Sequence, residues 1–193
     1  MDWIYWGKPL PGFGDPAARL LILGLAPAAH GGNRTGRMFT GDGSAQFLMA
    51  ELYKFGFANQ PSSTSMGDGL RLEDAYMTAV VRCAPPKNKP TLKEIQICKR
   101  YWTEELRFLP NIRVVLALGK VAFEAYVKYV KEHGVDTKGF KFGHGAVYKA
   151  PVPYPVLVAS FHPSRQNTQT GKLTESMFDS VLREVKQVTE SSG

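Results

Sequence analysis

Four short apolar runs divide the chain at regular intervals. They cover residues 20–25, 75–81, 114–118 and 156–161, and each is rich in Val, Leu, Ile and Ala without a strict polar alternation. A continuous apolar run of this length is typical of a strand that is covered on both faces, as in a parallel sheet. The pattern therefore predicts four buried strands.

Helical patterns fill the intervals between the apolar runs. Their bounds follow from an apolar stripe, a capping residue at the start and a glycine near the end. The clearest start is the capping box from Thr91 to Glu94, which follows Pro90. The predicted helices cover about 43–55, 91–109, 120–133 and 174–188. The alternating order predicts an α/β fold of three layers, α/β/α, around a central, mostly parallel four-stranded sheet.

Length and composition fit a single domain over residues 1–193, because 44% hydrophobic and 11% aromatic residues can fill a sizeable core. No apolar run approaches the roughly 18–20 residues that a membrane-spanning helix needs. Two cysteines cannot form the dense disulfide framework of a small secreted module. We therefore expect a soluble cytoplasmic protein with no membrane partner.

The formal charge of +7 is concentrated in one part of the chain. Between residues 82 and 100, six basic residues face one acidic residue, Glu94. A polyanion would suit such a stretch, and the alternative is a charged face that merely contacts solvent. The basic residues are Arg82, Lys87, Lys89, Lys93, Lys99 and Arg100.

The loop after the first apolar run carries five glycines from Gly24 to Gly41. Its backbone N–H groups can therefore approach a ligand closely. Neither G-x-x-x-x-G-K-[ST] nor G-x-G-x-x-G occurs in it, so no motif supports a nucleotide cofactor. Its hydrogen-bonding groups and its aromatic ring suit a polar, planar ligand: His30, Asn33, Arg34, Arg37 and Phe39.

The last apolar run ends in a second polar segment. His162 follows the strand directly and precedes Pro163, which limits its freedom and suits a side chain that points into a site. A structural histidine at the strand end is the alternative. The donors beside it can contact phosphates or the edges of a nucleic-acid groove: Ser164, Arg165, Gln166 and Asn167.

Together these two segments resemble the uracil-DNA glycosylase superfamily, most closely its family 5 (type b), the iron–sulfur branch of bacteria and archaea. The resemblance lies in GLAPAAHGGNRTGR-x-FTGD at 24–42 and HPSRQN at 162–167, supported by YWGKPLPGFGDP and TAVVRCAPP-x-NKPT. It extends over about the whole chain. It implies a monofunctional hydrolase of base excision repair that cleaves the N-glycosidic bond of uracil in DNA.

The resemblance implies that a damaged nucleotide swings out of the duplex into a pocket. His162 would donate a hydrogen bond to the base oxygen on which negative charge grows. Asn33 and Asp42 are the candidates for holding the attacking water, and Asn33 is preferred because Asp42 also suits a helix cap. The residues expected to bind the flipped base are Gly24, Leu25, Ala26, Phe39 and Asp42, with Phe39 stacking on its ring.

Two positions depart from the pattern of the relatives. Many relatives carry Asp, Glu or Asn where this chain has Leu25 and Ala26, so the usual carboxylate base is absent. An Asn that reads the uracil edge in related enzymes is replaced by Thr-Ala-Val at 78–80. These departures fit a broader pocket that also admits hypoxanthine and xanthine, as the family implies.

Cys83 and Cys98 resemble the downstream half of the four-cysteine ligand set of a [4Fe–4S] cluster. In relatives the upstream pair precedes the YWG segment, where this chain begins, so a truncated start and a lost cluster are both open. Two thiolates cannot hold the cluster alone. The alternative is structural, with Cys98 buried on its helix and Cys83 closing a strand.

Double-stranded DNA that contains uracil or another deaminated base is the implied partner. Relatives insert residues at the place of Arg165 and Gln166 into the minor groove, where they fill the gap left by the flipped base. The other expected DNA contacts are Arg34, Arg37, Lys87, Lys89, Ser164 and Asn167. We expect a monomer of a prokaryotic cytoplasm, associated with the nucleoid, and a replication clamp is a further candidate partner.

Two other functions stay open. A module of this fold that binds DNA without catalysis would also explain the absent carboxylate and the half ligand set. A zinc hydrolase would use His30, His162, Cys83 or Cys98, but no H-E-x-x-H or C-x-x-C spacing supports it.

Overall fold

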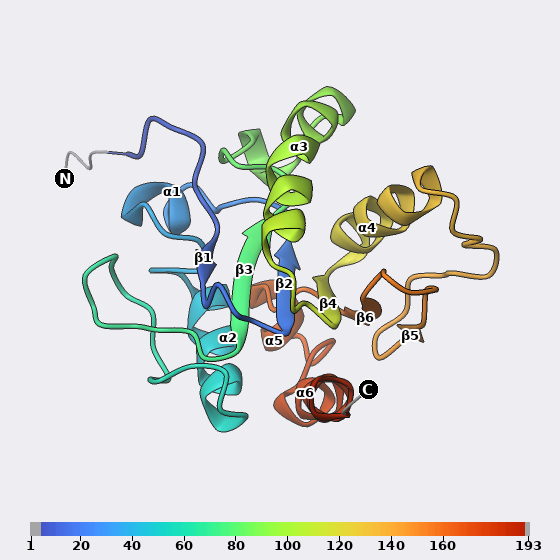
Figure 1. The fold of residues 1–193 in the computed structure, drawn as a ribbon. Helices are drawn as coiled ribbons and strands as arrows, with labels where there is room; N and C mark the ends of the chain where they lie inside the picture. The colour runs from blue at the N-terminus through green and yellow to red at the C-terminus, as the bar shows by residue number, and fades with distance from the viewer. Residues whose placement is uncertain (1–4, 192–193) are drawn as a thin grey trace.

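The computed structural model describes residues 5–191, and within them the sheet has six strands in the order β1-β3-β2-β4-β6-β5 (Figure 1). The four central strands pair in parallel, as predicted. They are β2 (Leu20–Gly24), β3 (Ala75–Ala79), β4 (Val114–Leu118) and β6 (Val156–Ser160). The prediction of four strands missed two antiparallel edge strands of two residues each, β1 (Phe13–Gly14) and β5 (Val147–Tyr148).

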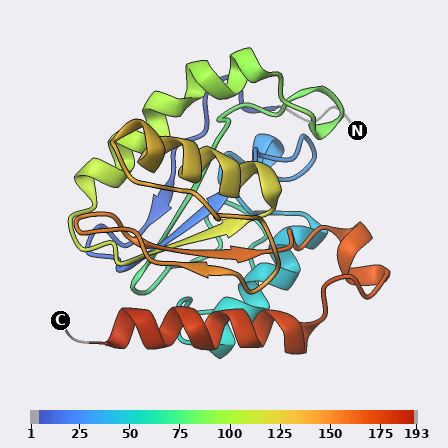
Figure 2. The ribbon, with the colours of Figure 1, turned by 90° about the vertical axis from the view of Figure 1, so that its right-hand side faces the viewer.

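Helices cover both faces of the sheet, which confirms the three-layer prediction. Figure 2 shows α6 along one face with α2 beside it, and α3 and α4 on the other face. The four long helices are α2 (Gly43–Lys54), α3 (Leu92–Phe108), α4 (Lys120–Glu132) and α6 (Glu175–Glu190). Three short helical segments lie in loops: α1 (Gly32–Thr35), the 3-10 helix η1 (Pro86–Asn88) and α5 (Arg165–Gln169).

Strand β2 shows why its run is apolar at every position. Leu20 and Ile22 pack into the core on the side of α2 and α6, whereas Leu21 and Leu23 pack into the core on the side of α3 and α4. All four side chains are fully buried. A strand with a helix layer on each face has no solvent-exposed side, so its sequence does not alternate between apolar and polar residues.

The predicted helix starts are confirmed by their caps. Asp42 accepts the N–H of Ala45 at the start of α2, and Thr174 caps α6 in the same way. At α3 both halves of the predicted capping box are present, with Thr91 and Glu94 bonding to each other's backbone. Each cap stabilises the folded chain by on the order of 1 kcal/mol.

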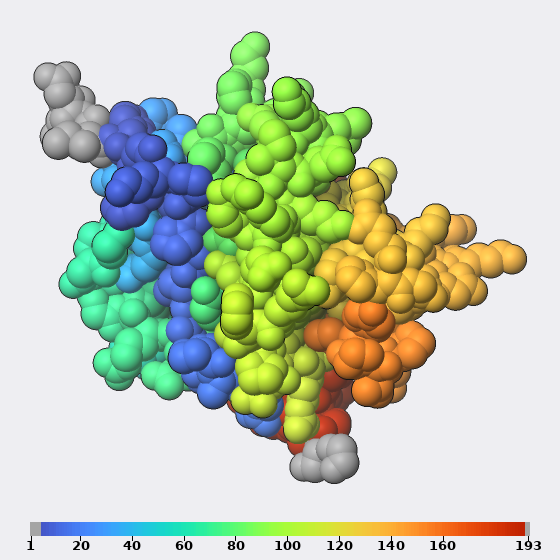
Figure 3. Space-filling model, turned by 45° about the horizontal axis from the view of Figure 1, so that its top comes forward, coloured from blue at the N-terminus to red at the C-terminus, as the bar shows by residue number. Residues whose placement is uncertain are grey.

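Helix α3 is tied to the sheet through a partly buried carboxylate. Glu105 accepts hydrogen bonds from Gly12 N (3.1 Å) and Thr78 Oγ1 (2.6 Å), and it pairs with Arg82. Figure 3 shows α3 in yellow-green lying against the blue N-terminal segment that Gly12 belongs to. Because Arg82 is buried, it does not belong to the basic surface expected between residues 82 and 100.

Within residues 5–191, none of the helices combines the length and the apolar character that crossing a bilayer would require.

A buried acid between α2 and α6 makes stability depend on pH. Glu51 is 2% exposed and contacts Lys54 Nζ at 2.9 Å, and that ammonium lies 3.2 Å from Asp179 Oδ1. Burial, together with the neighbouring Asp179 carboxyl group, raises the pKa of Glu51 to about 7, although Lys54 acts in the opposite direction. The folded chain therefore keeps a proton that an unfolded glutamate loses above about pH 4.3.

We expect Glu51→Gln to flatten the pH dependence of stability. Because the folded pKa of Glu51 is raised, its contribution is full at low pH and is lost between about pH 4.3 and pH 7. Gln carries no proton to lose, so the variant should gain stability relative to the parent between pH 5 and pH 8. Urea unfolding at pH 5 and at pH 8 measures this, with Glu124→Gln, at an exposed position of α4, as the control. If the free energy of unfolding changed equally with pH in the parent and in Glu51→Gln, the raised pKa of Glu51 would be contradicted.

Candidate active site

Two loops that are far apart in the sequence meet at the carboxyl edge of the sheet. Phe39 lies in the glycine-rich loop after β2, and His162 follows β6. Their ring centroids are 6.3 Å apart with an interplanar angle of 28°. Gly119, just after β4, is close as well, since a Cβ there would lie 3.4 Å from the Cβ of His162. Ligands of open α/β sheets bind at this edge.

A small cavity of about 40 Å³ lies at this junction. Its lining combines four of the predicted residues, Ala26, Phe39, Asp42 and His162, with Pro27, Ala28, Met38, Ser44 and Ala79. This volume holds a few water molecules. Three predicted residues do not line it. Asn33 lies in α1, and the carbonyls of Gly24 and Leu25 accept the N–H groups of Val80 at 3.0 Å and Val81 at 2.9 Å.

Gly24 allows the Phe39 ring to lie directly over the end of β2. A Cβ on Gly24 would be 2.8 Å from Phe39 Cζ, closer than a real Cβ can come. The backbone of Phe39 has a φ of 47°, in the left-handed region that non-glycine residues rarely adopt. Such a conformation costs on the order of 1–3 kcal/mol, and it places this ring beside His162.

The turn after His162 is held by hydrogen bonds to its carbonyl. Ser164 N and Asn167 Nδ2 each donate to His162 O at 2.8 Å, and the Ser164 side chain caps α5. Both residues were predicted as DNA contacts, and these hydrogen bonds show that they also stabilise the turn between His162 and α5. On the other side, Phe161 N donates to His144 Nδ1 at 3.2 Å.

His144 was missed by the sequence analysis. Its Nε2 lies 3.3 Å from Met177 O, and its ring stacks on Phe161 with centroids 5.0 Å apart. Burial lowers the pKa of His144, which favours the neutral ring that accepts the Phe161 N–H. In the sequence His144 is a single histidine between Gly143 and Gly145. Only the folded structure shows that its ring contacts Phe161, the residue before His162.

His162 is a neutral imidazole at neutral pH. Burial lowers its pKa, and the nearby Asp42 carboxylate opposes this only in part. A neutral ring offers one N–H donor and one acceptor nitrogen. Asp42 itself accepts Ala45 N at 2.9 Å through Oδ1, which confirms the cap, and its Oδ2 lies where a Cβ on Gly31 would stand.

The prediction that Arg37 contacts phosphate is corrected by the structure. Arg37 is 8% exposed, and its Nη2 bonds both carboxylate oxygens of Asp68 at 2.8 and 2.9 Å. The same nitrogen donates to Ser63 Oγ at 2.9 Å, and Nε donates to Thr40 Oγ1 at 3.0 Å. A buried guanidinium with these partners cannot reach a DNA backbone.

Asp68 completes this network. Burial alone would raise the pKa of Asp68, but the backbone N–H groups of Leu70, Thr64 and Ser65 together with Arg37 outweigh it and lower the pKa to about 2. The carboxylate is therefore charged throughout the neutral range. It joins the loop of residues 62–70 to the glycine-rich loop.

The other predicted DNA contacts lie on the surface at the same edge of the sheet. Lys87 and Lys89 are exposed in and after η1, on the loop that leaves β3. Arg165 and Gln166 are exposed at the start of α5. Arg34 lies over Gly41, where a Cβ would be 2.6 Å from its Nη2.

The two cysteines are free thiols, Cys83 exposed and Cys98 partly buried. Burial raises the pKa of Cys83, and the nearby Cys98 and Glu94 act in the same direction. Among residues 5–191 no group of three or more His, Cys, Asp or Glu side chains could hold a metal ion. Cys83 and Cys98 supply two of the four thiolates that a [4Fe–4S] cluster needs, so these two residues do not fit the group by themselves.

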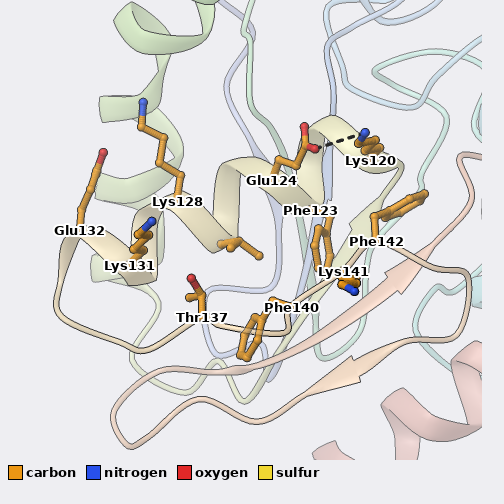
Figure 4. Close-up of a pocket in the computed structure, with 11 residues that line it drawn as sticks. Lys120, Phe123, Glu124, Lys128, Lys131, Glu132, Thr137, Phe140, Lys141 and Phe142 are labelled. Carbon is orange, nitrogen blue, oxygen red and sulfur yellow. Dashed lines mark ion pairs between the residues drawn. The ribbon is translucent and has the colours of Figure 1, made fainter.

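A larger hollow lies elsewhere. It measures about 990 Å³ and runs along α4, against residues 137–142 (Figure 4). Four lysines surround an apolar floor there: Lys120, Lys128, Lys131 and Lys141. It shares no residue with the cavity beside His162.

Breaking the buried Arg37–Asp68 pair should destabilise the fold. We expect Arg37→Met to lower the free energy of unfolding by about 3–5 kcal/mol, because it leaves a buried carboxylate without its cation. Arg71→Met, on an exposed arginine, should change it by less than about 0.5 kcal/mol. Chemical denaturation of both variants measures the difference. If Arg37→Met left the free energy of unfolding unchanged, the structural role of Arg37 would be contradicted and the expected DNA contact would again be the better explanation.

Comparison with known proteins shows the family of the chain. The family described as the Uracil DNA glycosylase superfamily matches residues 11–186. The chain is 54% identical over 185 residues to the type-5 uracil-DNA glycosylase of Thermus thermophilus, covering 95% of this chain and 82% of that protein.

Two further relatives carry the same name. The chain is 48% identical over 182 residues to the type-5 uracil-DNA glycosylase of Pyrobaculum aerophilum, covering 94% of this chain and 77% of that protein. It is 46% identical over 188 residues to that of Mycobacterium tuberculosis, covering 97% and 69%. With its fold, its cavity at the carboxyl edge and these relatives, the chain belongs to the uracil-DNA glycosylase superfamily.

Proposed function

We propose that this chain is a uracil-DNA glycosylase of base excision repair, which hydrolyses the bond between uracil and deoxyribose in DNA. The observation that carries the proposal is the meeting of Phe39 and His162 at one cavity at the carboxyl edge of the sheet. Relatives of 43–54% identity over most of the chain are named as type-5 uracil-DNA glycosylases, which supports it.

The base reaches the cavity by leaving the duplex, at a cost of a few kcal/mol that is lowest for mispaired bases. Because the cavity measures about 40 Å³, the rings of Phe39 and His162 must move apart to admit a pyrimidine. Phe39 then stacks on the base, as aromatic rings prefer. The carbonyls of Gly24 and Leu25 already accept Val80 N and Val81 N, so Ala26 is the better placed of the three for contact with the base.

His162 stabilises the departing base. Negative charge grows on the base oxygen as the glycosidic bond breaks, and a preorganised donor aimed at that oxygen lowers the barrier. The neutral imidazole can donate through its N–H. Of the two candidates for holding the attacking water, Asp42 lines the cavity and Asn33 does not, so we now favour Asp42.

The end of β3 supports a broad base preference. Ala79 lines the cavity, and the Thr78 hydroxyl is bonded to Glu105, so neither offers an amide to the base edge. Hypoxanthine and xanthine are therefore proposed as further substrates. We also propose that a single domain acts as a monomer on duplex DNA, with Lys87, Lys89 and the α5 segment facing the backbone.

We expect His162→Ala to lower the rate of uracil release by about a hundredfold or more, because it removes the donor to the departing base. Its affinity for DNA should stay within about twofold, since the phosphate contacts are elsewhere. Release of free base from a duplex with a single G·U pair measures the rate, and fluorescence anisotropy measures the affinity. If His162→Ala released uracil at the parental rate, His162 would not be the donor that stabilises the departing base. A parent chain that binds the duplex but releases no base would favour the non-catalytic module.

Charge reversal of Lys87 and Lys89 to Glu should weaken binding to all duplexes alike. Phosphate contacts carry no base information, and each one contributes a slope of about −0.9 in log affinity against log salt. Affinities for uracil-containing and undamaged duplexes at two salt concentrations measure the effect. Reversal of Lys138 and Lys149, exposed beyond α4, is the matched control. A change in base preference would show that the lysines read the base.

A further inference from the structure

The direction of the His162 ring depends on the backbone that carries it. Among residues 5–191 no hydrogen bond reaches the His162 side chain, whose ring lies beside that of Phe39. The His162 carbonyl, by contrast, accepts two hydrogen bonds from the turn that follows it. The orientation of the imidazole therefore depends also on what holds the chain just before it, at Phe161.

Phe161 lies at the point where the hydrogen bonding of the sheet ends. The last bond on the β4 side joins Gly119 N to Ser160 O at 2.8 Å. On the β5 side, Gly145 N donates to Ala159 O at 2.8 Å. The next outward donor is Phe161 N, and within the part of the chain that the structure describes no backbone carbonyl accepts it.

The His144 ring takes the place of that carbonyl. Its Nδ1 lies 3.2 Å from Phe161 N, and its Nε2 lies 3.3 Å from Met177 O of α6. One neutral tautomer satisfies both contacts, with Nδ1 as the acceptor and Nε2–H as the donor. Ser160 Oγ lies 3.4 Å from the same Nδ1, but its hydroxyl donates to Phe161 O at 2.9 Å.

The Phe161 side chain is held by the same histidine. The two rings stack with centroids 5.0 Å apart and an interplanar angle of 27°, and Lys172 Nζ lies 5.3 Å from the Phe161 centroid. Without the acceptor on His144, the Phe161 N–H would have no partner, and partly buried backbone donors are rarely left in that state. The segment would shift to find another acceptor, and His162, the next residue, would shift with it.

We propose that His144 is a positioning residue for uracil release, because it fixes the backbone at Phe161 and thereby orients the His162 N–H toward the base oxygen. The inference rests on the proposed function, in which His162 is the donor to the departing base. His144 does not line the cavity beside His162; it lines a separate hollow of about 290 Å³ against α6. Its effect on the reaction is therefore transmitted through Phe161.

Two substitutions separate the roles of the two ring nitrogens. Asn places its side-chain oxygen where Nδ1 lies and can still accept the Phe161 N–H, whereas Gln places its amide group where Nε2 lies. We expect His144→Gln to lower the single-turnover rate of uracil release from a G·U duplex about tenfold or more, because a 1 Å misplacement can cost about a hundredfold. His144→Asn should keep the rate within about threefold of the parent, because the acceptor is retained.

Binding is measured on a duplex with a single 2′-fluoro-deoxyuridine, which resists hydrolysis. Both variants should keep the parental affinity within about twofold, since the phosphate contacts lie elsewhere. A rate loss without an affinity loss is the result expected for a misdirected donor. Equal rate losses in His144→Asn and His144→Gln would overturn the proposal, because the acceptor at Nδ1 would then not be what matters.

A double-mutant cycle with His162→Ala tests whether the effect passes through His162. His144→Gln should lower the rate about tenfold or more in the parent and by less than about twofold in the His162→Ala background. A loss of the same size in both backgrounds would mean a general structural defect and would overturn the proposal. The cycle is repeated with His144→Leu, so that a folding defect in one variant, detected by thermal unfolding, leaves the other to decide.

The matched control is His133→Gln, at the exposed end of α4, which should leave the rate of uracil release unchanged. A parent chain that releases no uracil contradicts the proposed function itself. A parent that releases uracil, together with a folded His144→Gln variant that releases it at the parental rate, contradicts only the role of His144.

Discussion

The close packing of the Phe39 ring on the bare backbone of Gly24 is the contact on which the site depends. A side chain at 24 would stand 2.8 Å from the ring. The strained backbone of Phe39 is tolerated because the glycine-rich loop is anchored on both sides, by the end of β2 and by the cap of α2. The ring beside His162 thereby defines a cavity whose walls come from the end of β3 and from the segments that follow β2 and β6.

Two carboxylates tie together the segments that surround that cavity. Glu105 ties α3, β3 and the segment around Gly12 together, and Asp68 ties the loop of residues 62–70 to Arg37. Each accepts several hydrogen bonds, and removal of Arg37 would leave the buried charge of Asp68 without its cation. In the proposed mechanism such a frame keeps the His162 donor preorganised, and preorganised donors lower a barrier without reorganising during the reaction.

Local signals made much of this fold predictable. The four apolar runs and the capping box at Thr91 are read from neighbouring residues, and the structure confirms them. The edge strands β1 and β5 have two residues each, too few for a pattern. Arg37 was assigned to DNA because its partner Asp68 lies 31 residues away, and His144 was missed because its contact to Phe161 spans 17 residues. When two residues far apart in the chain become partners only through tertiary folding, the spacing of residues in the sequence does not indicate the contact.

A crystal structure of the chain bound to a duplex with 2′-fluoro-deoxyuridine tests the central claim most directly. The account predicts an extrahelical uracil that stacks on Phe39 with a carbonyl oxygen within hydrogen-bond distance of the His162 ring. A duplex bound with its uracil still stacked, or a flipped base held at another surface such as the hollow along α4, would contradict it.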